Sequence, residues 1–527
     1  MNDASTPARP EQRRTQRTVG IVFLVLLLLA GLGVALTLTG HARIGGGGEQ
    51  QQTDDRPNII LFSSDDQRVD EMEFLPTVQK VLGAHGLTFS NAITPHPLCC
   101  PARAEILTGQ LAQNNHVWTN FQPKGGYPNL DKYSTIGTDM SGAGYNTAFL
   151  GKPLNGYNND DGHDPGWTIF NASTHGFSNY YDFTQFEQDH VEHVKGYYTD
   201  YVADKTVEYL HDLHESDKPF FMWVSHFAPH AKAGGPGCHD SACRHGPPPM
   251  SPSYRLQAKG TGEKPNQERA DQLARDIINS PAWHERNVSD KPHIIRRQPF
   301  HSPRKVVRQR EGRAAALASL DDAFSRMIDQ LEADDELDNT YIVFITDNGY
   351  QLGEHNWFGK ILPYEENVRT PMLVRGPGIA PNTTTPQIVS IVDLAATFLD
   401  IAHAQPTDGR VLDGRSMLPI WHGDREANLH PGGLLVQGGP FKPENGTTGW
   451  LFRGVRTGRY SYAKWYDGFV ELYDRKSDPL QMHSVAKDPR YRAIRRELAR
   501  RTDILKTCSG PNACNRQFGP LPPIKRR

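Results

Sequence analysis

The chain has 527 residues, and its 57 lysines and arginines against 60 acidic residues leave a formal charge of −3. This balance argues against nucleic-acid binding, which calls for a strongly basic face or tail. A hydrophobic fraction of 37% that includes 8 Trp, 19 Tyr and 22 Phe excludes a disordered chain. The length allows several domains with a large core.

The N-terminus has the pattern of an exported protein. Residues 1–17 are basic, and residues 18–40 contain no charged side chain. As a helix rising 1.5 Å per residue, the uncharged run is long enough to cross a bilayer core of roughly 30 Å. Because basic flanks stay in the cytoplasm, the rest of the chain should lie outside it. Two alternatives remain: a single-pass anchor in the cell membrane, or a long signal peptide cut near Ala42 that releases a secreted protein. Residues 41–55, rich in Gly and Gln, predict a flexible linker.

Two short apolar runs predict buried strands of one sheet. NIILF at 58–62 and YIVFI at 341–345 each lead into acidic and amide residues. Continuous apolar runs are typical of parallel strands covered on both faces, and binding sites form at the carboxyl edge of such sheets. Apolar residues at helical spacing predict a helix over 317–331 and another over 388–402. We therefore expect an α/β fold with a large mixed, mostly parallel sheet flanked by helices.

The remaining chain divides into a polar insertion and a smaller domain. Residues 231–310 are rich in Pro, Gly, Lys, Arg and His without strong periodicity, so we expect a long excursion over the surface. Its basic side chains fit either a solvated face or the rim of a pocket for an anionic substrate. Short aromatic runs after residue 405 predict an antiparallel meander, followed by a basic helix over about 490–505. These patterns predict a main domain over 56–405 and a smaller C-terminal α+β domain over 406–527.

Four of the six cysteines form two closely spaced pairs in loops rich in Gly or Pro. In an oxidising compartment, Cys238 with Cys243 and Cys508 with Cys514 could each close a small disulfide loop. For the first pair, a zinc site completed by His239 and His245 is the alternative.

The other two cysteines, Cys99 and Cys100, lie in LCCPARAEILTGQ over residues 98–110. A nucleophilic cysteine favours a nearby cation and a helix N-terminus, which Arg103 and the helix-forming AEILTG would supply. A buried, inert cysteine pair beside a helix start fits the same spacing. The segment reads Cys-x-Pro-x-Arg, then four residues, then Thr-Gly, and so resembles the signature of the formylglycine-dependent sulfatases, with Ala102 where that family often has Ser.

The resemblance implies a fold, a nucleophile and a maturation partner. The fold would be alkaline-phosphatase-like, with residues 56–405 as the catalytic domain. Cys99 would be oxidised after translation to 3-oxoalanine, also called formylglycine, by a formylglycine-generating enzyme. The hydrate of that aldehyde would be the nucleophile, and Arg103 would support it. An aldehyde hydrate can expel sulfate and regenerate itself, which a simple alcohol cannot.

The residues at the two strand ends resemble the metal ligands of the family. Asp65-Asp66 and Asp347-Asn348 match its two calcium-binding pairs, and Cys99 would complete the set. Hard oxygen ligands suit Ca²⁺ or Mg²⁺, and the sequence does not distinguish between these ions. Each pair alone would also fit a turn or a helix cap. Two pairs at strand ends on either side of Cys99 favour the metal site.

Two other segments resemble parts of the family that bind sulfate. In GYNTAFLGKP, Lys152 takes the place of a lysine that contacts the sulfate. In FFMWVSHFAPH, His230 rather than His226 takes the place of a histidine that binds sulfate and donates a proton. Leu154 stands where many sulfatases have a catalytic histidine. The Lys-x-Leu-Asn pattern of this chain instead resembles the one carried by the N-acetylglucosamine-6-sulfatases and the extracellular heparan-sulfate 6-O-endosulfatases.

A third segment, GYQLGEHNWFGK over 349–360, contains two further candidate residues. Lys360 matches the second sulfate-binding lysine of the family by its interval from Asp347. His355 lies between them and would line the same pocket. Together, the matched motifs imply a catalytic set that comprises Cys99, Arg103, Lys152, His230, His355 and Lys360.

The function implied is hydrolysis of sulfate esters, with a sulfated small molecule or saccharide as substrate and no nucleic-acid partner. A divalent cation and the basic side chains would stabilise the charge on the sulfate oxygens, while His230 would protonate the leaving oxygen. Three alternatives remain. The first is a related hydrolase of phosphonate monoesters or phosphodiesters. The second is a non-catalytic, membrane-tethered protein that binds sulfated sugars. The third is a metal-binding or redox role for the cysteines.

Overall fold

The computed structural model describes residues 54–174, 179–232, 246–249, 266–440 and 449–525. The described residues all belong to one compact unit. The predicted segments 1–17 and 18–40, most of the linker 41–55, and the Cys238–Cys243 pair with its alternative zinc ligands lie outside the described residues. Within the described part, no helix combines the length and the apolar character that crossing a membrane requires.

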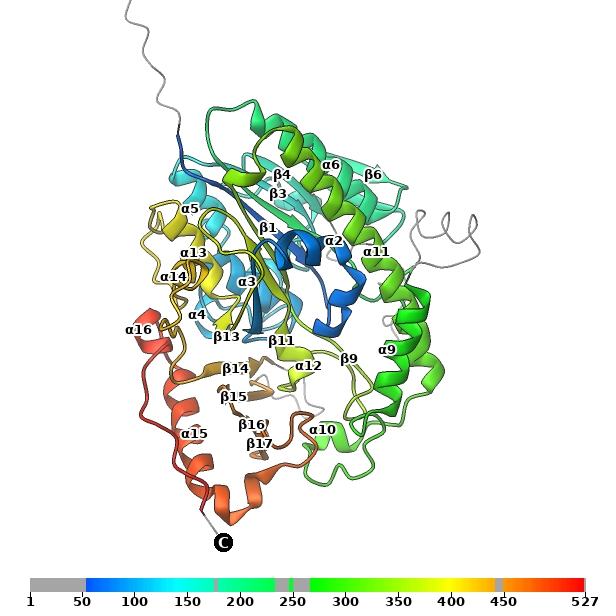
Figure 1. Cartoon of the computed structure of the whole chain (residues 1–527), viewed down its shortest axis with the longest axis vertical. Coiled ribbons are helices and arrows are strands. Elements are labelled where there is room, and N and C mark those ends of the chain that lie inside the picture. The colour runs from blue at the N-terminus through cyan, green and yellow to red at the C-terminus, as the bar shows by residue number, and fades with distance from the viewer. Residues whose placement is uncertain (1–53, 175–178, 233–245, 250–265, 441–448, 526–527) are drawn as a thin grey trace, which may run out of the picture. The chain divides into compact units, whose positions relative to one another are not determined.

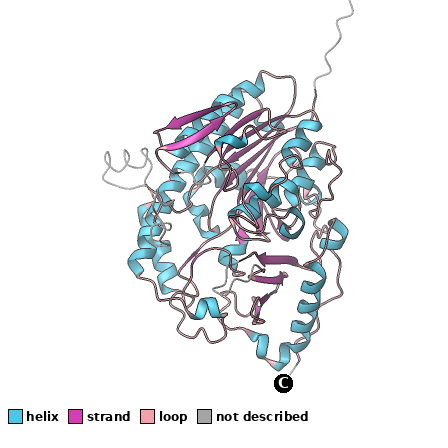
Figure 2. Ribbon diagram, turned by 180° about the vertical axis from the view of Figure 1, so that it is seen from behind, coloured by secondary structure: helices cyan, strands magenta, loops and turns pink. Residues whose placement is uncertain are grey.

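A mixed sheet of 11 strands lies at the centre of the described residues (Figures 1 and 2). Its order is β11 (Arg369–Thr370), β2 (Leu87–Ile93), β12 (Met372–Arg375), β8 (Thr340–Thr346), β1 (Asn58–Ser64), β7 (Phe220–Ser225), β3 (Asn146–Gly151), β4 (Ile169–Ser173), β5 (Phe183–Glu187) and β6 (His190–Val194), and β13 (Thr383–Ser390) pairs with β2. The central strands from β8 to β4 run parallel. The mostly parallel sheet and both predicted strands are confirmed. β1 and β8 are direct neighbours, in register from Asn58 opposite Thr340 to Ser64 opposite Thr346.

Helices cover both faces of this sheet, which explains why β1 and β8 are apolar at every core position. Ile60 and Phe62 pack in the cluster that includes α6 (Tyr198–His214) and α11 (Pro303–Ala333). Ile59 and Leu61 point to the opposite face, in the cluster with α3 (Cys99–Thr108), α5 (Ile136–Gly142) and α13 (Asp393–Ile401). Burial on both sides fixes the register of β1, and with it the position of the residues that follow it.

Two sequence predictions about helices require correction. The range 388–402 is not a single helix, because β13 extends to Ser390 and α13 begins only at Asp393. The described part of 231–310 is more ordered than expected, since it contains α9 (Gln267–Asn279), α10 (His293–Arg296) and the first turns of α11. The buried face of α9 has only four apolar side chains: Ala270, Leu273, Ala274 and Ile277. Because charged residues separate these four positions, the sequence pattern did not indicate a helix. The helix over 317–331 is confirmed as part of α11.

The C-terminal part forms the predicted antiparallel sheet, in the order β14 (Leu434–Gly438), β15 (Phe452–Arg456), β16 (Tyr460–Trp465) and β17 (Val470–Asp474). The basic helix is α15 (Arg492–Leu505), which packs Ile494 and Leu498 into the same apolar cluster as Val455 and Tyr462. Cys508 and Cys514 form a disulfide, which confirms the second predicted pair. The short elements α2 (Pro76–Val78), α4 (Ala112–Asn115), β9 (Gln351–Leu352), β10 (Phe358–Gly359), α12 (Glu365–Val368), α14 (Leu418–Trp421) and α16 (Pro511–Cys514) complete the described α-helices and β-strands, which short 3-10 and π-helical turns accompany.

Candidate active site

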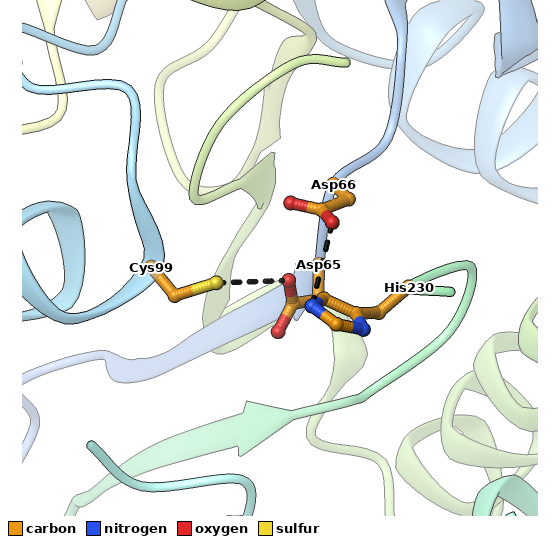
Figure 3. A group of neighbouring side chains, drawn as sticks. All are labelled: Asp65, Asp66, Cys99 and His230. Atoms are coloured by element: carbon orange, nitrogen blue, oxygen red, sulfur yellow. Dashed lines mark hydrogen bonds and ion pairs between the residues drawn. The ribbon is translucent and has the colours of Figure 1, made fainter. Parts of the chain in front are cut away.

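The site lies at the carboxyl edge of the central strands. Asp65 and Asp66 follow β1, Asp347 follows β8, Lys152 follows β3, and His230 lies beyond the end of β7. These strands are adjacent and parallel, so residues far apart in the sequence meet at one edge. Figure 3 shows the Cys99 and His230 side chains directed toward Asp65 and Asp66. One potential metal-ligating atom of each of these four residues lies within 4.8 Å of the others.

The acidic and amide residues form a buried group of oxygen atoms. The Asn348 Nδ2 donates to Asp66 Oδ1 at 2.6 Å, and the Asp66 backbone N–H donates to Asp347 Oδ1 at 3.2 Å. The Asn348 Oδ1 is buried and has no hydrogen-bond partner among the described residues. An unpartnered buried oxygen beside three carboxylates is the donor set that a hard divalent cation accepts. The five predicted metal ligands Asp65, Asp66, Cys99, Asp347 and Asn348 are all at most 1% exposed.

The crowding of these carboxylates perturbs their pKa values. Burial raises the pKa of Asp347 to about 6, and the negative charge of Asp65 adds to the effect. Burial acts in the same direction on Asp65. On Asp65, however, the positive charges of Lys152, His230 and Arg103 outweigh the effect of burial, so the pKa of Asp65 falls below its usual range. At neutral pH the group therefore contains ionised carboxylates that basic side chains compensate.

Cys99 is the first residue of α3, and its sulfur lies among the charged groups. The Sγ atom is 3.5 Å from Asp65 Oδ1, 2.7 Å from the Lys360 Nζ and 3.5 Å from the Lys152 Nζ. Burial nevertheless raises the pKa of the thiol well above its usual value, and the Asp65 charge raises it further. A cysteine reacts as its thiolate, so an unmodified Cys99 would be a weak nucleophile at neutral pH.

Arg103 lies one helical turn after Cys99, on the same face of α3. Its guanidinium donates from Nε to Asp347 Oδ2 at 3.0 Å and from Nη2 to Asp65 Oδ2 at 3.1 Å. The Nη1 atom donates to the Lys152 carbonyl at 2.8 Å and to Ser225 Oγ at 2.5 Å. Arg103 therefore joins the loops after β1, β8 and β3 to the end of β7, and it is only 1% exposed.

Lys152 and Lys360 reach the group from different loops. Lys152 forms an ion pair with Asp65, and the Lys360 Nζ donates to Asp66 Oδ1 at 2.5 Å. Lys360 keeps 14% of its side chain exposed and Lys152 only 4%. Both ammonium groups contact the sulfur of Cys99, so a negatively charged group bound beside Cys99 would meet two cations.

His230 presents one ring nitrogen to this group. Its Nδ1 donates to the Ala231 carbonyl at 2.7 Å, which leaves Nε2, 3.5 Å from Asp66 Oδ2, to gain or lose the proton. Burial lowers the pKa of His230 to about 4, although Asp66 and Asp65 act in the opposite direction. The second candidate, His226, packs against the Phe62 ring at 4.8 Å, and neither of its ring nitrogens has a partner among the described residues.

His355 has different neighbours from the other predicted residues. Its Nδ1 pairs with Glu285 Oε2 at 2.7 Å, and its ring stacks on Tyr364 at 4.4 Å. The described contacts of His355 thus join it to Glu285 and Tyr364 rather than to the group around Cys99. A role for His355 in lining the pocket stays a prediction.

Three residues that support the site were not found from the sequence. Ser225 accepts from Arg103, and Glu285 holds His355. Arg313 on α11 donates to the Asp66 carbonyl at 2.6 Å and to the Pro229 carbonyl at 3.3 Å, so it braces the loops of both Asp66 and His230. The available signal was a charged residue within the apolar stripe of a helix, since Arg313 precedes Leu317 by one turn.

Comparisons with known proteins identify related sequences. A family model described as Sulfatase matches residues 57–404, and one described as N-sulphoglucosamine sulphohydrolase, C-terminal, matches residues 353–507. The chain is 30% identical over 519 residues to the N-acetylglucosamine-6-sulfatase of Homo sapiens, covering 86% of the chain and 85% of that protein. It is 33% identical over 384 residues to the extracellular sulfatase SULF-1 homolog of Drosophila melanogaster. That match covers 69% of the chain but only 31% of the relative.

Solved structures share the fold. The structure of BT4656 in complex with its substrate D-glucosamine-2-N,6-O-disulfate aligns with a TM-score of 0.66 at 24% identity, covering 85% of this chain and 97% of that one. The phosphonate monoester hydrolase of Agrobacterium radiobacter aligns with a TM-score of 0.57 at 19% identity, covering 84% and 94%. At these identities the likeness concerns the fold alone.

Proposed function

The chain belongs to the sulfatase family, as its resemblance in sequence indicated, and we propose that it hydrolyses sulfate esters of a sulfated carbohydrate. The observation that carries the proposal is the convergence on Cys99. A buried cysteine at a helix N-terminus contacts two lysines and lies beside a group of oxygen ligands and a histidine. The carbohydrate class is supported by the relatives, which include N-acetylglucosamine-6-sulfatases.

Sulfatases employ a divalent cation and a formylglycine residue, and the residues present fit both groups. We propose Ca²⁺, with Mg²⁺ as the alternative, held by Asp65, Asp66, Asp347, Asn348 and the converted Cys99. The unpartnered Asn348 oxygen supports this assignment. Because burial raises the pKa of the Cys99 thiol, the unmodified group would be a weak nucleophile at neutral pH, and the proposed reaction therefore requires its conversion. When present, the aldehyde hydrate supplies an oxygen nucleophile and the cation supplies positive charge at the sulfate.

The remaining side chains bind the ester and move its proton. Lys152 and Lys360 each have an ammonium in contact with Cys99 and would bind the oxygens of the sulfate, where charge builds up in the transition state. Arg103 is committed to Asp65 and Asp347, so it orients the carboxylates rather than the substrate. His230 would donate its Nε2 proton to the leaving oxygen, and a bound sulfate raises the protonated fraction of this ring by attraction.

Turnover of matched substrates tests the reaction class. We expect hydrolysis of an aryl sulfate with kcat/KM at least about 100-fold above that of the matching aryl phosphonate monoester, which corresponds to about 2.7 kcal/mol of transition-state discrimination. A preference for the phosphonate would contradict the proposal and support the related phosphorus hydrolases.

The raised pKa of Asp347 in the metal-free protein should make calcium binding depend on pH. A cation competes with the proton on Asp347, whose pKa is raised to about 6, so binding should be independent of pH above that value. Below it, the half-saturating calcium concentration should rise up to about tenfold for each pH unit. Titration of chelator-treated protein with calcium, followed by thermal unfolding between about pH 5 and about pH 8, measures this dependence. A half-saturating calcium concentration that stays the same across this pH range would refute the assignment of Asp347 as a ligand. The Asp347→Asn variant is the control, with weak binding at every pH.

We propose that the protein acts outside the cytoplasm, either anchored through residues 18–40 or secreted after their cleavage. The uncharged run behind a basic segment supports this location, as does the Cys508–Cys514 disulfide, because disulfides persist in oxidising compartments. A formylglycine-generating enzyme would then be its partner during maturation.

A further inference from the structure

A pocket in the described part of the chain lies next to the loop that carries Lys360. It has a volume of about 780 Å³ and is lined by the first turns of α11, the preceding loop and the residues around β10. This size is within the usual range for pockets that hold small ligands. None of its lining residues is acidic, whereas Arg304, Lys305 and Arg308 are all basic.

Among the residues that the structure describes, the three cations of this pocket have no acidic partner. Within the described ranges, Arg304, Lys305 and Arg308 form no ion pair, although other arginines of α11 do: Arg310 and Arg313 both pair with Glu71. The ammonium of Lys305 is half-buried and lies over the Phe358 ring, 3.9 Å from its centre. Burial without a partner lowers the pKa of Lys305. Arg304 and Arg308 are exposed, so one half-buried and two exposed cations face the same pocket, and such a grouping favours an anionic ligand there.

The aromatic residues of the lining connect this pocket to the proposed sulfate site. Trp357 and Phe358 line the pocket, and Lys360, whose ammonium contacts Cys99, follows two residues later. Two residues of extended chain span at most about 7 Å. The Trp357 Nε1 also donates to the Lys360 carbonyl at 3.2 Å, which ties the wall to the lysine. The pocket and the site at Cys99 are thus close enough for one extended ligand to reach both, and in the pocket that ligand would meet aromatic rings as well as cations.

We propose that this pocket binds a second anionic group of an oligosaccharide whose sulfate ester lies at Cys99. The substrate class is then a chain of sugars carrying at least two negative groups, sulfate or carboxylate, rather than a single sulfated sugar. The aromatic side chains would pack against the apolar face of a sugar ring, and the cations would pair with its anionic substituent. This inference rests on the proposed function, because it takes the site at Cys99 as the place of reaction.

A charge-removal variant tests the pocket. The combined substitutions Arg304→Ser, Lys305→Met and Arg308→Ser remove three charges, while Lys487→Met, Arg492→Ser and Arg496→Ser remove three exposed charges from α15 and the loop before it. The probes are an aryl sulfate and a sulfated tetrasaccharide that contains glucosamine. We expect the pocket variant to lower kcat/KM for the tetrasaccharide at least about tenfold, to flatten its dependence on salt, and to change aryl sulfate turnover less than about threefold. The control variant should match the wild type on both probes.

Equal losses on the tetrasaccharide in the two triple variants, or no loss in the pocket variant, would overturn the inference. Failure of the proposed function has a different signature, namely that the wild type hydrolyses neither probe. Calorimetric binding of the tetrasaccharide remains informative in that case, because it requires no turnover. A Kd at least about tenfold higher in the pocket variant alone would support the anionic site, and equal Kd values in the pocket and control variants would reject it.

Discussion

Replacement of Cys99 with alanine is expected to lower kcat by at least about 10⁴-fold while the protein stays folded. The substitution removes the only proposed nucleophile, and the remaining cations and carboxylates can bind a sulfate ester but cannot attack it. Because the side chain is small and the ammonium groups of Lys152 and Lys360 keep their pairs with Asp65 and Asp66, unfolding should change little. Stopped assays with an aryl sulfate, together with thermal unfolding, measure both effects.

The neighbouring cysteine supplies a matched control. Cys100 is equally buried on α3, and its sulfur accepts from the Asn155 backbone N–H at 3.1 Å, outside the group around Asp65. The Cys100→Ala variant should retain turnover within about threefold and lose about 1 kcal/mol of stability through a small cavity. Equal activity in the Cys99 and Cys100 variants would remove Cys99 from the mechanism.

The second large effect is expected at Arg103. An Arg103→Met variant leaves Asp65 and Asp347 without their shared cation, so the free energy of unfolding should fall by about 3–5 kcal/mol. Arg103→Lys keeps the charge but cannot form the fork that joins both carboxylates, Ser225 and the Lys152 carbonyl. The lysine variant should therefore lose less stability than the methionine variant, yet kcat/KM should fall about 10²–10³-fold in both. Denaturant unfolding and steady-state kinetics separate the two quantities.

Arg410 tests whether such losses follow from any buried arginine. It forms a comparable fork with Asp139 and its side chain is only 6% exposed, but it contacts none of the residues assigned to catalysis. Arg410→Lys should cost stability while kcat/KM stays near the wild-type value. If Arg103→Lys behaved in the same way, Arg103 would be a structural residue only.

The sequence identified those parts of the site that depend on local pattern. The strand runs 58–62 and 341–345 are unmistakable because both faces of β1 and β8 are buried, so no polar residue interrupts them. Asp65, Asp66, Asp347 and Asn348 follow directly, and parallel pairing of the two strands brings them together. The disulfide was predicted from the short spacing of its cysteines. In each case the residues concerned are close together in the sequence or directly follow a strand.

The parts that were missed depend on contacts between distant segments. Arg313 reaches the Asp66 carbonyl from 247 residues away, and Glu285 meets His355 across 70 residues. The apolar stripe around Arg313 indicates that this charge is buried, but nothing in the sequence near Arg313 or Glu285 identifies the partner. The helix α9 was missed because its buried face is short and surrounded by charge. The boundary between β13 and α13 was missed because a continuous apolar run fits a strand and a buried helix alike.

Mass spectrometry of the tryptic peptide Val81–Arg103, from protein made in its native host, tests the central claim most directly. This peptide contains both Cys99 and Cys100, so Cys100 serves as an internal control for chemical oxidation. The account predicts an aldehyde in place of the –CH₂SH group at Cys99 and an ordinary thiol that can be alkylated at Cys100. A fully unmodified thiol at Cys99 would contradict it, and a protein that binds sulfated sugars without cleaving them would become the better description.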